Sequence, residues 1–116
     1  MTTTPPTTIS EVLLRQMAAE IRDEIPEAEV RLFGSHARGD ARPSSDVDLM
    51  ITVSDDWYAS HNRFEVLGQL WNKLARYRVP VDLLLYPRSK VEEPRHWLSH
   101  VIAQAYREGK VLDGPL

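Results

Sequence analysis

Residues 31–53, RLFGSHARGDARPSSDVDLMITV, constrain the fold more than any other part of the chain. A short apolar run ends at Gly34-Ser35, ten residues rich in turn formers follow, and an Asp-Val-Asp step opens a second apolar run. The serine and acids at that step also fit a helix capping box. The run that follows is short, contains β-branched residues and stops at polar ones, which favours a strand. Side chains two apart on a strand share a face, so the carboxylates of Asp46 and Asp48 are predicted to lie side by side.

Asp46 and Asp48 placed this close would repel each other unless a positive group lay between them. Hard divalent cations such as Mg²⁺ take oxygen ligands and are commonly held by one or two carboxylates together with substrate phosphates. The Gly-Ser step offers what phosphates need: Gly34 lets the backbone approach a ligand, and Ser35 can cap a short helix whose free N–H groups favour an anion. An ordinary turn with a helix cap is the alternative. Together the two features indicate phosphoryl or nucleotidyl transfer.

A third acid, Asp82, lies within the apolar run VPVDLLLY of residues 79–86, which is predicted to be a buried strand. Asp is almost never fully buried without a partner, so Asp82 needs a cation, a strong donor or a route to solvent. A salt bridge to an arginine would also satisfy it. If a neighbouring strand places Asp82 beside Asp46 and Asp48, the three carboxylates form a site able to hold two metal ions.

The combined pattern resembles that of a known superfamily: Gly-Ser, a gap of ten residues, Asp-x-Asp with apolar flanks, and a lone Asp in a later strand. It is similar to the nucleotidyltransferase superfamily that includes DNA polymerase beta. The strings GSHARG at residues 34–39 and SDVDL at 45–49 resemble its small prokaryotic branch, the minimal nucleotidyltransferases (MNT), typified by antitoxins encoded beside HEPN-domain toxins. The resemblance covers residues 9–112 and identifies the superfamily more specifically than the substrate.

This resemblance implies ATP, or another nucleoside triphosphate, as co-substrate together with two Mg²⁺ ions. It implies that Asp46, Asp48 and Asp82 are both the metal ligands and the catalytic acids, with Asp82 helping to deprotonate the attacking hydroxyl. It also implies that Gly34 and Ser35 hold the β- and γ-phosphates. For minimal members, the implied acceptor is a hydroxyl of a partner HEPN toxin, which adenylylation (AMPylation) would neutralise.

Two other functions stay open beside protein adenylylation. The protein could be a non-catalytic antitoxin that masks its toxin by stoichiometric binding, although unneeded buried carboxylates would be costly. It could also be a small-molecule nucleotidyltransferase of the antibiotic-modifying type, working as a homo-oligomer that shares its site between subunits. The acceptor, the base preference and the oligomeric state are not defined by the sequence.

Arg38 and the histidines are further candidates for ligand binding. Arg38 lies in the first turn of the predicted loop helix, where its guanidinium could reach a phosphate, and a salt bridge to Asp40 is the alternative. His96 and His100 are four residues apart and would share a helix face, but no third zinc ligand is evident. We assign no role to His36.

Composition narrows the class of partner. The chain has 116 residues, of which 42% are hydrophobic and 27% charged, as expected for one globular domain. With 14 basic against 17 acidic residues, it lacks the basic stripe that a long nucleic acid requires. There is no cysteine, no visible secretory signal and no apolar run near the ~20 residues of a membrane span, so a cytoplasmic location without membrane contact is expected.

Apolar periodicity predicts an α/β fold with a small mixed β-sheet and helices packed against it. The resemblance implies that residues 9–116 form a single nucleotidyltransferase domain whose sheet has three to four strands. Residues 1–8 are expected to be a disordered tail. Asp55 and Asp56 are expected in a solvated turn or helix cap, and the aromatic residues of the second long helix in the core. The predicted helices cover residues 9–25, 35–38, 64–77 and 94–108, and the predicted strands cover 27–33, 46–53 and 79–85, with a short edge contact at 111–112.

Overall fold

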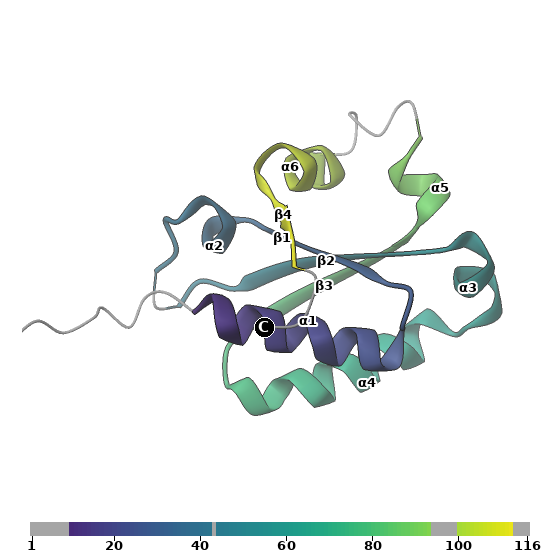
Figure 1. Cartoon of the computed structure of the whole chain (residues 1–116), viewed down its shortest axis with the longest axis horizontal. Coiled ribbons are helices and arrows are strands. Elements are labelled where there is room, and N and C mark those ends of the chain that lie inside the picture. Colours follow the sequence, from purple (N-terminus) through teal and green to yellow (C-terminus); the bar gives the residue numbers. More distant parts are fainter. Residues whose placement is uncertain (1–9, 43, 94–99, 113–116) are drawn as a thin grey trace, which may run out of the picture.

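A four-stranded mixed sheet with the order β3-β2-β1-β4 forms the centre of the molecule (Figure 1). The computed structural model describes residues 10–42, 44–93 and 100–112. β2 is parallel to β3 and antiparallel to β1, which in turn is antiparallel to β4. The predicted α/β fold with a small mixed sheet is thereby confirmed. The strands are β1 Glu29–Phe33, β2 Val47–Val53, β3 Val81–Pro87 and β4 Lys110–Val111.

Helices cover both faces of this sheet, as Figure 1 shows. Helices α1 and α4 lie against one face, and α5 and α6 lie against the other. Within the described ranges, no helix has both the length and the apolar character that crossing a membrane requires. The helices are α1 Glu11–Glu24, α2 Ser35–Arg38, α3 Asp55–Ser60, α4 Arg63–Leu74, the 3-10 helix η1 Ala75–Tyr77, α5 Arg88–Val91 and α6 His100–Glu108.

The larger core lies between the sheet and the pair α1 and α4. Helix α1 begins at a serine cap, because the Ser10 hydroxyl accepts from the N–H of Leu13 at 3.1 Å. Almost all of β2 is buried, which explains why its sequence is a continuous apolar run rather than an alternating one. The smaller cluster on the opposite face holds α5 and α6 and consists of Phe33, Met50, Val91, Ile102 and Ala105.

Several predicted boundaries shift in the structure. Strand β3 begins at Val81 and includes Pro87, which is tolerated because β3 is an edge strand and no further strand needs its N–H. The second long helix is divided into α4 and η1. The expected disordered tail and His96 lie outside the described residues, and the last predicted helix is described only from His100 onward.

The prediction that the aromatic residues of the second long helix are core residues is wrong for two of them. Phe64 is 72% exposed and Trp71 is 44% exposed. The indole N–H of Trp71 donates to the carbonyl of Val81 at 3.1 Å, at the edge of the sheet. Leu70 and Leu74 supply the buried face of α4 instead.

The acids that follow β2 lie in helix α3. Ser54 is its N-cap and accepts from the N–H of Trp57 at 3.0 Å, while Asp55 and Asp56 lie in the first turn. The expected cap therefore exists, but it is made by the serine before the acids. Neither α3 nor α5 is anticipated by the sequence analysis, because each is too short to show a clear apolar period.

Candidate functional site

Asp48 and Asp82 are direct neighbours in the sheet. Strands β2 and β3 are parallel, and their register pairs these two residues. Paired residues of adjacent strands point to the same face, here the one covered by α5 and α6. Asp46 is exposed just before β2, two residues ahead of Asp48. The structure therefore brings the three predicted acids to one end of the two strands.

Asp82 is exposed, so of the alternatives for this acid the structure shows the route to solvent, and the prediction that β3 is a buried strand is correct only for Leu83 and Leu85. Strand β3 lies at the edge of the sheet, and the side chain of Asp82 reaches solvent there. Among the described residues, Asp82 forms no salt bridge with an arginine. Its connection to the site consequently rests on its place beside Asp48 and no longer on a buried charge.

The carboxyl group of Asp48 is destabilised in its charged form. Burial raises its pKa most, and the negative charges of Asp82 and Asp46 raise it further. The positive fields of His36 and Arg38 oppose this shift without cancelling it. A cation placed among the three acids would relieve the repulsion.

Gly34 lies directly against the carboxylate of Asp48. Its φ of +79° is in a region that side chains with a Cβ rarely adopt. A Cβ at this position would also lie 2.2 Å from Oδ2 of Asp48. Gly34 therefore ends β1 in a conformation that joins the backbone of the loop to the acidic end of β2.

Helix α2 follows immediately and matches the predicted residues 35–38. Its N-cap is Gly34, whose carbonyl accepts from the N–H groups of Ala37 and Arg38, both at 3.0 Å. The prediction that Ser35 caps this helix is thus wrong, since Ser35 is its first helical residue. Its hydroxyl is not used for capping, and this leaves it beside the glycine for another partner.

Arg38 makes the expected ion pair with Asp40 and a second one that the sequence does not reveal. Its Nε donates to Oδ2 of Asp40 at 3.1 Å, and its Nη1 donates to Oε1 and Oε2 of Glu108 at 3.0 and 3.2 Å. Glu108 is the last residue of α6 and also accepts from the N–H of Gly34 at 3.1 Å. Sequence analysis misses Glu108 because no motif links it to residues 34–38.

A pocket of about 330 Å³ opens above Asp48 and Asp82. Helix α6 supplies Gln104 and Val101 to its lining, and apolar side chains of the sheet complete the wall. The pocket therefore joins two carboxylates, one amide and an apolar surface. The full lining is Phe33, Asp48, Asp82, Leu84, Val101 and Gln104.

The three acids match a hard divalent cation in chemistry. Carboxylate oxygens are the ligands that Mg²⁺ takes, and Asp48 and Asp82 lie side by side on paired strands with Asp46 just before them. Within the described ranges, however, no three acidic or histidine side chains converge as closely as metal ligands do. The three carboxylates are ligands of the kind that the predicted Mg²⁺ ions take, but their side chains do not converge into a coordination site in this structure.

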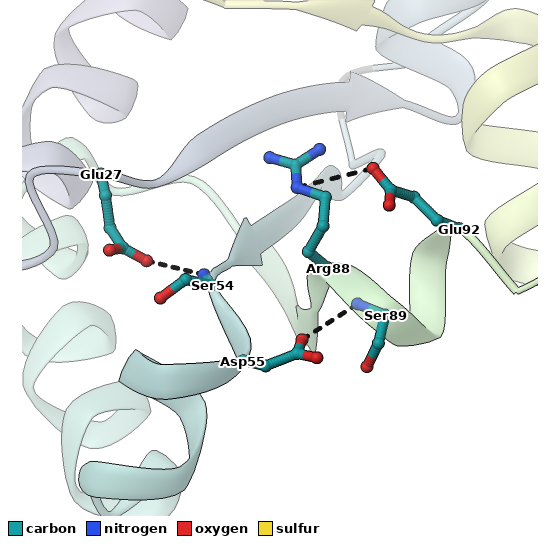
Figure 2. A pocket seen from close by; sticks show the side chains of 6 residues that line it. All are labelled: Glu27, Ser54, Asp55, Arg88, Ser89 and Glu92. Carbon is teal, nitrogen blue, oxygen red and sulfur yellow. Dashed lines mark hydrogen bonds and ion pairs between the residues drawn. The ribbon is translucent and has the colours of Figure 1, made fainter.

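A second pocket, of about 430 Å³, lies at the opposite end of β2 and β3 (Figure 2). Its polar groups satisfy one another: the N–H of Ser54 donates to Glu27 at 2.6 Å, and the N–H of Ser89 donates to Asp55 at 3.0 Å. Arg88 projects between Glu29 and Glu92, at 3.5 and 4.0 Å from their carboxylates. This pocket is larger than that at the acids, and its three carboxylates each have a hydrogen-bond or ion-pair partner.

Comparison with known proteins identifies the family to which the chain belongs. The family model for the nucleotidyltransferase domain matches residues 14–110. MJ1379 of Methanocaldococcus jannaschii, whose name gives a proposed protein adenylyltransferase activity, is 30% identical over 95 residues, which cover 74% of this chain and 93% of the relative.

Solved structures show the same fold. A toxin–antitoxin structure with AMP-PNP aligns with a TM-score of 0.60 and 25% identity, covering 87% of this chain and 73% of the other. A variant of the MntA–HpeT toxin–antitoxin gives 0.61 and 23%, with coverages of 92% and 75%. A structure described as a minimal nucleotidyltransferase gives 0.58 and 24% with full coverage of both chains. Because the family model matches residues 14–110, most of the sequence, the chain belongs to the nucleotidyltransferase family.

Proposed function

We propose that this protein is a Mg²⁺-dependent nucleotidyltransferase that transfers AMP from ATP to a hydroxyl group of a partner protein. One observation carries the proposal: Asp48 has Asp82 beside it on the next strand and Gly34 against its carboxylate. The acids that would attract a cation and the backbone that would approach phosphate therefore meet at a single point.

Each residue of the candidate site would have its own role in the reaction. Asp46, Asp48 and Asp82 would hold Mg²⁺, which when bound stabilises the charge on the attacking and leaving oxygens. The N–H of Gly34 and the hydroxyl of Ser35 would bind the β- and γ-phosphates. Asp82, exposed at the sheet edge, would accept the proton of the incoming hydroxyl. The new O–P bond forms at the α-phosphorus, the bond to the β-phosphate breaks, and pyrophosphate leaves.

The exposure of Asp82 supports a macromolecular acceptor. A hydroxyl on the surface of another protein can approach an edge strand without entering a deep cavity, and β3 is such an edge. The name of MJ1379 includes protein adenylyltransferase activity, and one similar toxin–antitoxin structure contains AMP-PNP. The similarity to MntA–HpeT supports a toxin, of the HEPN type in our proposal, as the acceptor.

The test is intact-mass analysis of the product of the neighbouring gene, after incubation with this protein, ATP and Mg²⁺. We expect a mass gain of one or more AMP units. The gain should disappear in the double variant Asp46→Asn/Asp48→Asn and on addition of EDTA. Transfer that persists in this variant would contradict the proposal.

A matched control removes the same charge from the other end of β2. The variant Asp55→Asn/Asp56→Asn changes two adjacent exposed acids in α3, and we expect it to transfer AMP normally. Tight binding of the partner without any mass change would favour stoichiometric masking. Absence of binding, with modification of small hydroxyl compounds, would favour the small-molecule alternative.

A further inference from the structure

Three hydrogen-bond donors converge on a single oxygen atom, Oε1 of Glu108. The backbone N–H of Gly34 lies 3.1 Å from it, Nη1 of Arg38 lies 3.0 Å from it, and the amide Nε2 of Gln104 lies 2.7 Å from it. A second contact joins Nη1 of Arg38 to Oε2 at 3.2 Å. A backbone N–H, a guanidinium and an amide around one anionic oxygen are the groups that proteins use for phosphate oxygens.

The fold determines that Glu108 takes this position. Strand β4 pairs with β1 so that Lys110 faces Leu32, which brings the end of α6 beside the end of β1. The turn between them requires Gly109, because a Cβ there would lie 2.3 Å from the carbonyl oxygen of Ala105 and 2.4 Å from that of Leu32. The carboxylate of Glu108 is therefore delivered to the loop by a fixed turn.

The environment of Glu108 favours a negative charge. Burial alone would raise the pKa of Glu108, but the hydrogen bonds from Gln104, Arg38 and Gly34 outweigh it and lower the pKa. The Glu108 side chain is 17% exposed and that of Arg38 is 41% exposed, so the contacts from Gly34 and Gln104 are more shielded from water than the one from Arg38. The donors together surround a single anionic oxygen, which the protein supplies from its own carboxylate.

The same donors belong to the candidate active site. Gly34 touches the carboxylate of Asp48, and Gln104 lines the pocket with Asp48 and Asp82. Val101, Gln104 and Glu108 lie on one face of α6 at helical spacing, so this helix contributes both a wall of that pocket and the carboxylate.

We propose that the N–H of Gly34, the guanidinium of Arg38 and the amide of Gln104 form an anion subsite, which Glu108 occupies in the free protein and a terminal phosphate of the nucleotide takes over. This inference rests on the proposed function, and it adds two residues of α6 to the site. Glu108 is an internal competitor, and Gln104 is a phosphate-binding residue. Because a glutamate side chain can rotate away at a helix end, the exchange replaces one anion with another and needs no movement of the sheet.

Binding of inorganic tripolyphosphate tests the subsite without any catalytic step. Isothermal titration calorimetry in metal-free buffer compares the native protein with Glu108→Gln, which keeps the size of the side chain and removes its charge. We expect about tenfold tighter binding in the variant, the size of one charge-assisted contact that no longer competes. In the Glu108→Gln background, Gln104→Leu should weaken binding by between about twofold and tenfold.

Two controls separate this effect from net charge and from loss of structure. Glu92→Gln removes the same charge from the exposed end of α5, and its affinity for tripolyphosphate should equal that of the native protein. If Glu108→Gln does not fold, Glu108→Asp retracts the carboxylate by one methylene and should also bind more tightly. Unchanged or weaker binding in the folded variant would overturn the proposal and make Glu108 a fixed support for Arg38.

The outcomes also separate this proposal from the proposed function. If Glu108→Gln binds tripolyphosphate more tightly while neither protein transfers AMP, the subsite stands and the nucleotidyltransferase proposal fails. If the native protein transfers AMP and the variant binds no more tightly, the function stands and the competing role of Glu108 fails. If neither protein binds tripolyphosphate, the subsite is contradicted, while the AMP-transfer assay with Mg²⁺ decides the proposed function separately.

Discussion

The two ends of the central strands carry different polar chemistry. At the C-terminal ends of β2 and β3, the carboxylates of Glu27 and Asp55 accept from backbone N–H groups, and Arg88 lies between two glutamates. At the N-terminal ends, Asp48 and Asp82 face each other, and Asp46 precedes them. The larger pocket lies at the end whose carboxylates each have a hydrogen-bond or ion-pair partner. The crowding of carboxylates therefore identifies the candidate active site better than pocket size does.

The largest difference between the two ends should appear in catalysis. We expect Asp46→Asn/Asp48→Asn to lower the rate of AMP transfer at least about a hundredfold, because even residues that only orient metal ligands cost about 10–100-fold when changed. Asp55→Asn/Asp56→Asn should keep the rate within about twofold, as expected for surface positions away from the chemistry. Single-turnover assays of both variants under the same conditions measure this contrast. Equal losses would remove the distinction between the two ends.

The next largest effect should be on stability, at the glycine beside the acids. Gly34→Ala should lower the free energy of unfolding by about 3 kcal/mol, because strain at positive φ is added to a clash with Asp48. Gly39→Ala is a matched control with φ +85° but nothing within 4 Å of its Cβ, and it should cost only about 1 kcal/mol. Urea unfolding curves give both values. Equal losses would show that contact with Asp48 does not constrain Gly34.

The two ends should also respond to pH in opposite directions. The pKa of Asp48 is raised by burial and by Asp82 and Asp46, so the folded state binds more protons there than the unfolded state and loses stability as pH rises from the unfolded pKa through the folded one. The pKa of Glu27 is lowered by the N–H of Ser54, so its contribution is present above the unfolded pKa and is lost as pH falls through the folded one.

A single substitution at each end can test these opposite signs. Asp48→Asn should raise stability at pH 7 by less than about 1 kcal/mol, since its carboxylate is partly hydrated, and this gain should vanish under acidic conditions. Glu27→Gln should give the opposite sign at pH 7. Thermal unfolding between pH 3 and pH 7 measures both variants, and a gain in Asp48→Asn that persists at pH 3 would contradict the assigned cause.

The smallest expected effect lies at the exposed edge of the far pocket. Glu92→Gln should change the free energy of unfolding by less than about 0.5 kcal/mol, because its contact with Arg88 at 4.0 Å is a surface ion pair. The rate of AMP transfer should also stay the same. A large loss of transfer in this variant would assign the far pocket a role that its paired carboxylates do not indicate.

Local sequence patterns predicted the elements of the site well. The turn-rich loop between two apolar runs correctly predicted strands β1 and β2 on either side of it, and α2 covers the four residues expected. The alternation of side chains along a strand also placed Asp46 and Asp48 at the start of β2. These features depend on neighbours within a few residues, which is the range over which periodicity and turn residues carry information.

Strand order and long-range pairing could not be predicted from such local patterns. Asp82 lies in an apolar run that was predicted to be a buried strand, but β3 is an edge strand and Asp82 is exposed on it. The contacts of Glu108 depend on the pairing of β4 with β1, and a strand of only two residues cannot be predicted from sequence periodicity. The N-cap of α2 is Gly34 and not the predicted Ser35, because the positive φ at the cap position favours glycine.

The contact between Gly34 and Glu108 joins residues 74 positions apart, and it depends on a strand at Lys110–Val111. Because a ribosome releases the N-terminal parts of a chain first, the loop and the acids emerge well before the carboxylate that meets them. Until β4 docks, the chain would hold the loop of residues 34–38 without the carboxylate of Glu108 and without the amide of Gln104. The pairing of the two residues of β4 with β1 would thus complete the anion subsite last, and it would bring the competing carboxylate and one of the donors to the loop together.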